Sequence, residues 1–161
     1  MAIYGYMKLE GEKQKLISAG CSTKESIGNK FQAAHVDEIM VLACTHELAN
    51  LENLDKPSHS PIVITKYVDK SSPLLARALA QREEIAATID FYRVAGEAGL
   101  VKFYSVSING GIISGLTLDL PHVLEEPDAE PQEHLALRYQ DITWTNHLTS
   151  TSGQTFWDEK P

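Results

Sequence analysis

The stretch IAATIDFYRVAGEAGLVKFYSVSI, residues 85–108, decides the fold class of this 161-residue chain. Its two halves, Ile85–Val94 and Leu100–Ile108, are rich in β-branched and aromatic residues, which favour strands. Gly96 and Gly99 lie between the halves and provide the backbone freedom that a turn needs. Because a short turn joins antiparallel neighbours, the stretch predicts a β-hairpin.

The residues after this hairpin are compatible with two different structures. Asn109, Gly110 and Gly111 interrupt the strand pattern, which resumes over Ile112–Leu120. Glycine permits both a second tight turn and a sharp bend inside a continuous strand. The sequence therefore predicts either a second turn or one long strand with a glycine kink.

Further strands are predicted on both sides of the hairpin, where segments with alternating or β-branched residues are bounded by turn residues. These segments are Ala2–Leu9, His35–Leu48, Pro61–Val68, His134–His147 and Gln154–Trp157. Within His134–His147 the parity of the apolar residues changes, so a bulge near Gln140–Asp141 is expected. Together with the hairpin, the chain would hold about seven or eight strands.

One segment has helical periodicity instead. In Ser71–Gln81, SSPLLARALAQ, Leu75 and Leu79 are four residues apart and most neighbours are good helix formers. The two serines precede Pro73, which suits the first turn of a helix, and a serine there would cap the helix. The predicted fold class is therefore all-β, a barrel or sandwich with one short α-helix attached.

Composition and charge exclude several classes of partner. The formal net charge is −8 and the basic residues are scattered, whereas binding to a nucleic-acid backbone needs clustered Lys and Arg. No apolar run approaches the roughly 18 residues of a membrane span, and the N-terminus lacks the pattern of a signal peptide. We expect a single domain made in the cytoplasm, with no nucleic-acid binding and no membrane insertion.

The segment Asp69–Ser72, DKSS, looks like the end of a phosphate-binding loop. Such a loop needs glycines, because their backbone N–H groups must converge on the phosphate before the helix begins. No glycine lies between Gly28 and Lys70. A strand, a polar turn and a helix start explain the same residues, so no nucleotide cofactor is predicted.

A second segment is rich in possible metal ligands. Its candidates are His122, Glu125, Glu126, Asp128, Glu130, Glu133 and His134. Prolines interrupt the segment and the spacing does not repeat, whereas metal sites need ligands that converge from rigid supports. A solvated acidic loop, with at most weak calcium-like binding, is the preferred interpretation, so no metal site is predicted.

Nucleophilic catalysis has equally little support. Ser114, Cys21 and Ser22 are the candidate nucleophiles, and none lies in a G-x-S-x-G pattern. Cys21 and Cys44 lack C-x-x-C spacing, so they are expected to be ordinary small residues. The sequence predicts no catalytic residue. A sheet protein with exposed edges must instead cap them, close into a barrel or pair them with another chain.

Several motifs together resemble one family. They are AIYGYMKLEG at 2–11, HVDEIMVLA at 35–43, ITKYVDKSSPLL at 64–75, HLALRYQDITWT at 134–145 and FWDE at 156–159. In this order and spacing they resemble the Hcp family, the hemolysin-coregulated proteins of bacterial type VI secretion systems. The resemblance covers essentially the whole chain.

The resemblance implies a β-barrel of two sheets with a short helix on its side, similar to phage tail-tube proteins. It implies a structural protein and no enzyme, with one tube domain over residues 1–161 and no C-terminal effector extension. Its members form six-membered rings that stack into a tube inside a contractile sheath, and some carry small effectors in the lumen. The implied partners are other copies of the chain and the sheath, baseplate and spike proteins, with export that needs no signal peptide.

The loop Asn50–Pro61 is the predicted contact surface. A closed ring needs two different complementary surfaces, for which edge strands and a long loop are suited. The predicted ring or tube contacts are Leu51, Asn53, Leu54, Lys56 and His59. The alternative function is a monomeric secreted effector or enzyme that reuses the same fold.

Overall fold

The computed structural model describes residues 3–157, so Ala2 of the first motif and the last two residues of FWDE lie outside the described residues. The strands are β1 Gly5–Gly11, β2 Lys15–Leu16, β3 Ile39–Val41, β4 Ala43–Thr45, β5 Leu48–Ala49, β6 Ser58–His59, β7 Ile62–Tyr67, β8 Ile85–Val94, β9 Leu100–Asp119, β10 Gln132–Arg138, β11 Asp141–Asn146 and β12 Thr151–Phe156. The helices are α1 Lys24–Ile27 and α2 Ser72–Ala80, with 3-10 turns η1 Gly28–Lys30, η2 Ala33–His35 and η3 Gly96–Ala98. The protein is mainly β, as the sequence predicts.

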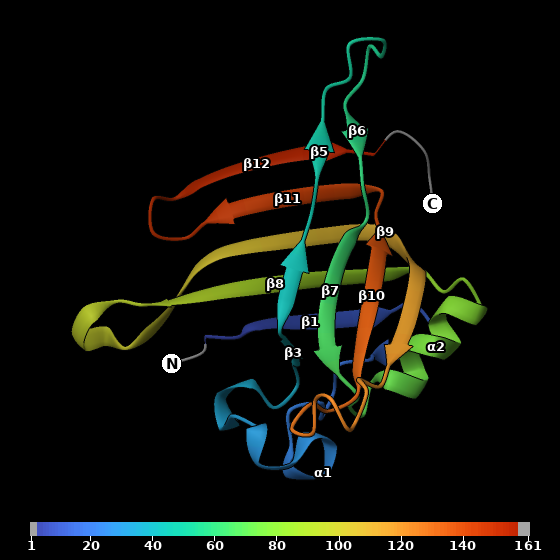
Figure 1. Cartoon of the computed structure of the whole chain (residues 1–161). Coiled ribbons are helices and arrows are strands. Elements are labelled where there is room, and N and C mark those ends of the chain that lie inside the picture. The colour runs from blue at the N-terminus through green and yellow to red at the C-terminus, as the bar shows by residue number, and fades with distance from the viewer. Residues whose placement is uncertain (1–2, 158–161) are drawn as a thin grey trace.

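Two groups of antiparallel strands cross each other around a common core (Figure 1). The first group holds β1, β8, the first half of β9, β11 and β12, with β2 and β3 paired to the free side of β1. The second group holds the last part of β9, β10, β7 and β4. Helix α2 lies at one side, and β5 and β6 form a separate two-stranded sheet.

The long strand β9 joins the two sheets. It decides between the two structures that the sequence allows after the hairpin, a second turn or one long strand with a glycine kink. Its pairing with β8 ends at Gly111, and its pairing with β10 begins at Ile112. Gly110 has a φ of +60°, and a Cβ on Gly111 would lie 2.4 Å from the carbonyl oxygen of Arg138. A glycine kink inside one strand is therefore confirmed, and a second turn is wrong.

The predicted β-barrel is not closed in the structure, because its two sheets form an open strand order. The path runs β2-β1-β8-β9-β10-β7-β4. β3 pairs with β1, and directly after Leu42 the strand β4 pairs with β7. Leu42 donates its backbone N–H to the carbonyl oxygen of Thr65 at 2.8 Å. The short segment 39–45 therefore pairs with β1 in the first sheet before Leu42 and with β7 in the second sheet after it. The two sheets cover one core, but their strands do not form one closed barrel.

The predicted bulge near Gln140–Asp141 is also wrong. The segment His134–His147 forms two strands, β10 in the second sheet and β11 in the first. Between them Gln140 donates its N–H to the carbonyl oxygen of Asn109, and its own carbonyl accepts from Trp157. The change of apolar parity therefore marks a change of sheet.

The start of α2 differs from its prediction as well. Ser71 already has helical angles and its side chain makes no capping hydrogen bond. Instead, Asp69 Oδ1 accepts from the Ser71 N–H at 2.8 Å, and Ser72 Oγ accepts from the Asp69 N–H at 2.9 Å. The polar turn before the helix is therefore held by Asp69 rather than by a serine cap.

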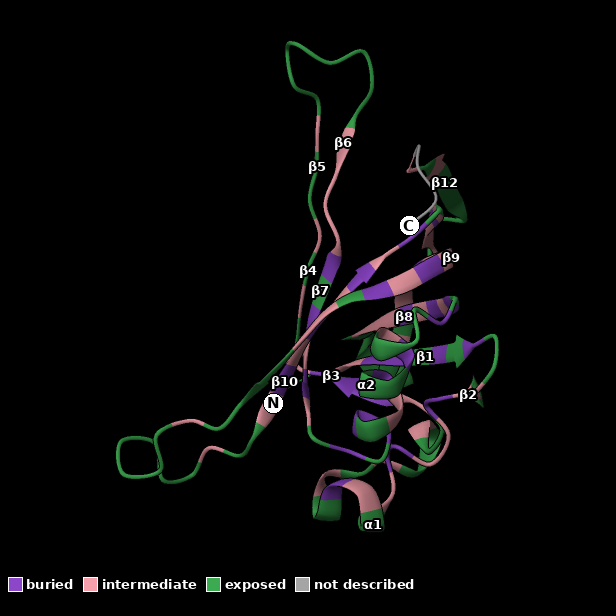
Figure 2. Cartoon of the chain, turned by 90° about the vertical axis from the view of Figure 1, so that its right-hand side faces the viewer, coloured by how far each residue is buried: buried purple, intermediate pink, exposed green. Residues whose placement is uncertain are grey.

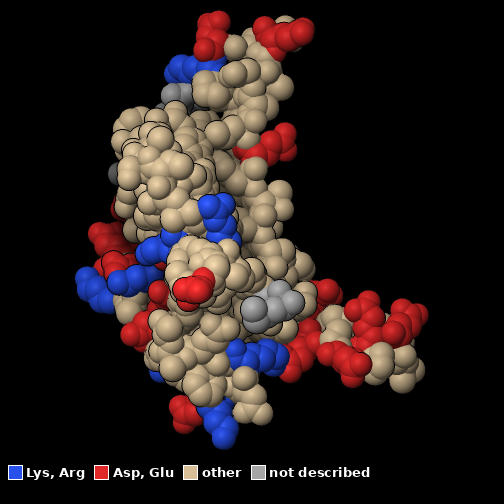
Figure 3. Space-filling view, turned by 90° about the vertical axis from the view of Figure 1, so that its left-hand side faces the viewer, with Lys and Arg blue, Asp and Glu red and all other residues tan. Residues whose placement is uncertain are grey.

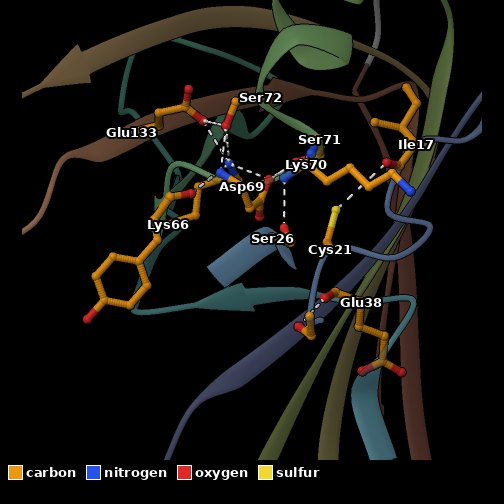
Figure 4. A network of polar contacts seen from close by, with 12 residues as sticks. Ile17, Cys21, Ser26, Glu38, Lys66, Asp69, Lys70, Ser71, Ser72 and Glu133 are labelled. Atoms are coloured by element: carbon orange, nitrogen blue, oxygen red, sulfur yellow. Dashed lines mark hydrogen bonds and ion pairs between the residues drawn. The ribbon is translucent and has the colours of Figure 1, made fainter. Parts of the chain in front are cut away.

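A buried ionic network holds this turn against two neighbouring strands of the second sheet, β7 and β10 (Figure 4). Lys66 on β7 is fully buried, and its Nζ lies 2.7 Å from Glu133 Oε2 on β10 and 3.1 Å from Asp69 Oδ1. Ser72 Oγ also donates to Glu133 Oε2 at 2.9 Å. Because each buried charge has several partners, the network explains how polar groups are tolerated in the core.

The core itself is aliphatic. Its fully buried side chains come from both sheets and from α2, and they include Met7, Leu9, Ile64, Leu75, Ile89, Leu135 and Ile142. Burial of each large aliphatic side chain contributes about 1.5–3 kcal/mol. Within residues 3–157, no helix is long and apolar enough to cross a membrane.

Candidate assembly surface

Two arms extend away from the two-sheet core (Figure 2). We call residues 46–60 the hairpin arm and residues 120–131 the acidic arm. In the hairpin arm β5 and β6 pair through Leu48 with His59 and Ala49 with Ser58, and the tip spans residues 50–57. The acidic arm connects the end of β9 with the start of β10.

The tip of the hairpin arm holds four of the five predicted contact residues. The side chains of Leu51 and Leu54 are 51% and 56% exposed, which is unusual for two leucines so close together. Leu54 donates its N–H to the Leu51 carbonyl oxygen at 3.0 Å, so a tight turn carries both side chains. Asn53 and Lys56 are also exposed on this tip. The tip therefore offers an apolar pair with polar neighbours.

His59 lies elsewhere, at the base of the hairpin arm. Its ring stacks on Trp157 with the centroids 5.5 Å apart, and its Nδ1 lies 2.7 Å from the hydroxyl of Tyr139. His46, on the other leg of the arm, brings its Nε2 to within 2.9 Å of the same hydroxyl. Burial raises the pKa of Tyr139 to about 12, so this hydroxyl stays protonated.

Two grooves lie along the hairpin arm. One is lined by Leu48, Pro57, Trp144 and Thr155 among others, and the other includes Leu54, Pro57 and Trp157. Each groove therefore borders both the arm and the first sheet. An incoming chain that touches the arm would also cover part of the sheet.

The strand β12 is a second exposed surface. It pairs only with β11, so its outer backbone edge is unpaired within residues 3–157. Its sequence, TSGQTF, contains no charge and no proline, the residues with which proteins commonly protect an edge strand. Phe156 is 60% exposed. No local signal in the sequence identifies β12 as an edge, because its neighbour is set by long-range pairing.

The acidic arm combines exposed carboxylates with exposed apolar residues. Figure 3 shows acidic side chains gathered where this arm extends from the body. The apolar residues of the arm and of the adjoining end of β9, Leu118, Leu120, Val123 and Leu124, are 58–85% exposed. The run LDLPHVL at residues 118–124 carries these apolar residues and is the signal in the sequence that could have identified this surface.

The metal candidates of this segment do not converge. Glu133 is buried against Lys66, Glu130 forms an ion pair with Lys30 at 2.5 Å, and His134 Nδ1 contacts Thr65 Oγ1 at 3.1 Å. In the part of the chain that the structure describes, no group of three potential metal ligands comes together.

The candidate nucleophiles lie in two separate places, Cys21 and Ser22 side by side in the loop after β2 and Ser114 on β9. Burial raises the pKa of the Cys21 thiol to about 12, which disfavours its reactive thiolate. Ser22 is buried and donates to the carbonyl oxygen of Glu38, whereas Ser114 is exposed and donates to that of Ala136. None of these contacts activates the group for attack. Cys44 is half-buried, and the pair Cys21 and Cys44 is not linked by a disulfide.

A serine, a histidine and an aspartate do meet at Ser105. Ser105 Oγ lies 2.5 Å from Asp90 Oδ1 and 2.7 Å from His147 Nε2. The hydroxyl donates its proton to Asp90, so His147 Nε2 must donate to Oγ and cannot act as a base toward it. Because Ser105 is only 6% exposed, these contacts join neighbouring strands and do not form a nucleophilic triad.

Fold and surface together define a class of small β-proteins, with two crossed sheets, an uncharged free edge and arms that reach beyond the body. The chain belongs to the Hcp family of type VI secretion proteins, because the family model described as "Type VI secretion system effector, Hcp" matches residues 6–146.

Individual relatives agree with this membership. The "Major exported protein" of Pseudomonas aeruginosa is 34% identical, over 98% of this chain and 96% of the relative. The solved structure of secreted protein Hcp3 from Pseudomonas aeruginosa is 34% identical, with a TM-score of 0.85 over 98% of this chain and all of that one. A crystal structure described as Hcp protein gives a TM-score of 0.89 at 29% identity, over 97% of this chain and all of that one.

Proposed function

We propose that this chain is a subunit of the inner tube of a type VI secretion system. Copies of it close into six-membered rings, the rings stack into a tube, and contraction of the surrounding sheath expels the tube. The uncharged free edge of β12 carries the proposal, because such an edge is a template for a strand of another chain.

A ring needs two different surfaces that complement each other, since a head-to-tail contact repeats around the axis. In this proposal the β12 edge is one surface, and the tip of the hairpin arm with Leu51 and Leu54 contacts a neighbouring subunit or ring. Both surfaces lie on one subunit and differ in chemistry, one offering backbone groups and the other apolar side chains. The remaining predicted contacts, Asn53, Lys56 and His59, belong to the same arm.

The proposed partners are further copies of this chain and the sheath, baseplate and spike proteins of the system, together with small effectors held in the lumen. A relative named for its export supports secretion of this chain. The role is structural rather than enzymatic, and the contacts of Ser105 support it because they leave the serine without a base.

Negative-stain electron microscopy of the purified chain tests the proposal directly, because a ring with a central hole is visible. Sedimentation velocity of the same sample gives the number of subunits. We expect rings, and a second sample with Gln154→Lys on β12 should shift toward the monomer. Ala76→Lys on the exposed face of α2 adds the same charge away from the edge and should leave the rings intact. A strict monomer at high protein concentration would contradict the tube and favour the monomeric alternative.

A further inference from the structure

At the base of the hairpin arm, two histidines contact one hydroxyl group of the core. His46 precedes β5 and His59 lies in β6, so the two rings come from opposite legs of the arm. Both reach the Tyr139 hydroxyl, at 2.9 Å from His46 Nε2 and 2.7 Å from His59 Nδ1. Tyr139 is fully buried directly after β10. The three side chains therefore form a polar contact between the arm and the body.

This contact is complete only when at least one of the rings is neutral. A tyrosine hydroxyl has one proton to donate, and it can accept hydrogen bonds as well. It can donate to a bare nitrogen of one imidazole while it accepts from the N–H of the other. A protonated imidazole offers only donors, so two imidazolium rings would leave the hydroxyl proton without its acceptor. Their charges would also face each other across a single oxygen atom.

A cationic side chain lies against the tryptophan ring that stacks on His59. The guanidinium of Arg138 lies 4.4 Å from the centre of the Trp157 ring, and that ring stacks on His59. The carboxylates nearest in sequence, Glu47 and Asp55, are exposed on the arm.

The groove beside His59 is lined by Asp55 and Lys56, and Ser60 donates its backbone N–H to the Glu47 carbonyl. Within residues 3–157, neither ring forms an ion pair with a carboxylate. The base of the arm therefore holds two imidazole rings without an ion-paired carboxylate, and a hydrogen bond with the backbone of Ser60 offsets part of the effect of burial on the pKa of His46.

We propose that His46, Tyr139 and His59 form a proton-operated latch, which holds the hairpin arm against the core at neutral pH and releases it when the rings are protonated. The direction follows from His46. Burial, and then the proximity of His59, lower the pKa of His46 below its ordinary value of 6.5.

A group whose pKa is lowered in the closed form binds fewer protons there than in the open form. The latch is therefore fully stable above about pH 6.5 and loses free energy as the pH falls below it, by up to about tenfold in the closing constant per pH unit for His46.

The consequence for assembly rests on the proposed function. If the tip of the hairpin arm contacts a neighbouring subunit or ring, release of its base frees the tip from a fixed position, and binding then has to pay the entropy of ordering it. Assemblies would accordingly loosen in mildly acidic surroundings and persist at neutral pH.

The chain contains its own probe for the latch. Its two tryptophans both adjoin the histidines, with Trp157 stacked on His59 and the ring of Trp144 centred 6.4 Å from that of His46. Tryptophan fluorescence of the dilute full chain, followed from about pH 7.5 to 5.0, should change with a midpoint below 6.5. A double variant, His46→Gln with His59→Gln, should lose this transition. His122→Gln, in the exposed acidic arm, should keep it.

Fluorescence that stays constant over this range, or an unchanged transition in the double variant, would overturn the latch. If the double variant does not fold, nuclear magnetic resonance titration of the histidine rings in the unmodified chain provides the test. A midpoint of His46 at or above 6.5 would also overturn the proposal.

Sedimentation at both ends of the pH range separates the latch from the proposed function. A fluorescence transition together with unchanged assemblies would support the latch and show that the arm is not the contact between subunits. A transition accompanied by dissociation would support both.

Discussion

Lys66 and Glu133 form an ion pair inside the protein, with 2.7 Å between Nζ and Oε2 and side chains that are 0% and 6% exposed. The pair connects β7 with β10, and Ser72 extends it to the start of α2. Lys70, the lysine of the DKSS segment, instead donates its backbone N–H to Ser26 Oγ at 2.8 Å. The segment that looks like a phosphate-binding loop is thus the outer part of a structural network.

Loss of one member of this pair should be costly. Lys66→Met leaves the Glu133 carboxylate buried without its main partner, so the free energy of unfolding should fall by about 3–5 kcal/mol. Urea denaturation followed by circular dichroism measures the change. Lys30→Met removes an ion pair of which both members are partly exposed, and it should cost below about 1 kcal/mol. Equal losses in the two variants would show that Lys66 is no more important than a surface lysine.

Local patterns in the sequence suffice for much of the fold. The hairpin of β8 and β9 and the helix α2 are confirmed, because turn glycines and helical spacing act over a few residues. The change of sheet after Tyr139 could not be predicted, since a bulge and a change of sheet alter the parity of apolar residues in the same way. The open strand order likewise depends on where the segment 39–45 finds its partners.

In the candidate site, too, local features could be predicted from the sequence and long-range contacts could not. Exposure of Leu51 and Leu54 could be predicted, because apolar residues in a polar loop have no nearby core to join. The contacts of Tyr139 with His46 and His59 span 93 and 80 residues of sequence, and no local pattern brings them together. The free edge of β12 is equally a result of the completed sheet.

The kink in β9 should not tolerate a side chain. A Cβ on Gly111 would lie 2.4 Å from the carbonyl oxygen of Arg138, which belongs to a paired strand and cannot move freely. Gly111→Ala should therefore destabilise the protein by about 1–3 kcal/mol in thermal or urea unfolding. Gly115→Ala lies in the same strand, where the nearest atom would be 3.6 Å away, and should change stability far less. Comparable losses at both positions would argue against a specific close contact at the kink.

The tip of the hairpin arm should affect assembly but not folding. Leu51→Ala combined with Leu54→Ala removes apolar surface that is more than half exposed, so the unfolding transition should stay within about 0.5 kcal/mol. If the tip contacts a neighbour, the same variant should shift sedimentation toward smaller species. Val36→Ala, at a partly exposed residue of the body, is the control and should assemble normally. Assembly of the double variant at the level of the unmodified chain would remove the tip from the contact surface.

Salt should control how far the proposed rings stack. Each subunit has a formal charge of −8, and part of this charge is concentrated on the acidic arm. Because repulsion between exposed charges is screened beyond about 8 Å at physiological ionic strength, rings should persist at all salt concentrations while longer tubes need high salt or a template. Sedimentation velocity at about 0.05 M and about 1 M sodium chloride, where the screening length falls to about 3 Å, measures the distribution. Glu125→Gln with Glu126→Gln removes two exposed charges of the acidic arm and should lower the salt that stacking requires. Longer assemblies at low salt than at high salt would instead show that attraction between charged groups holds the rings together.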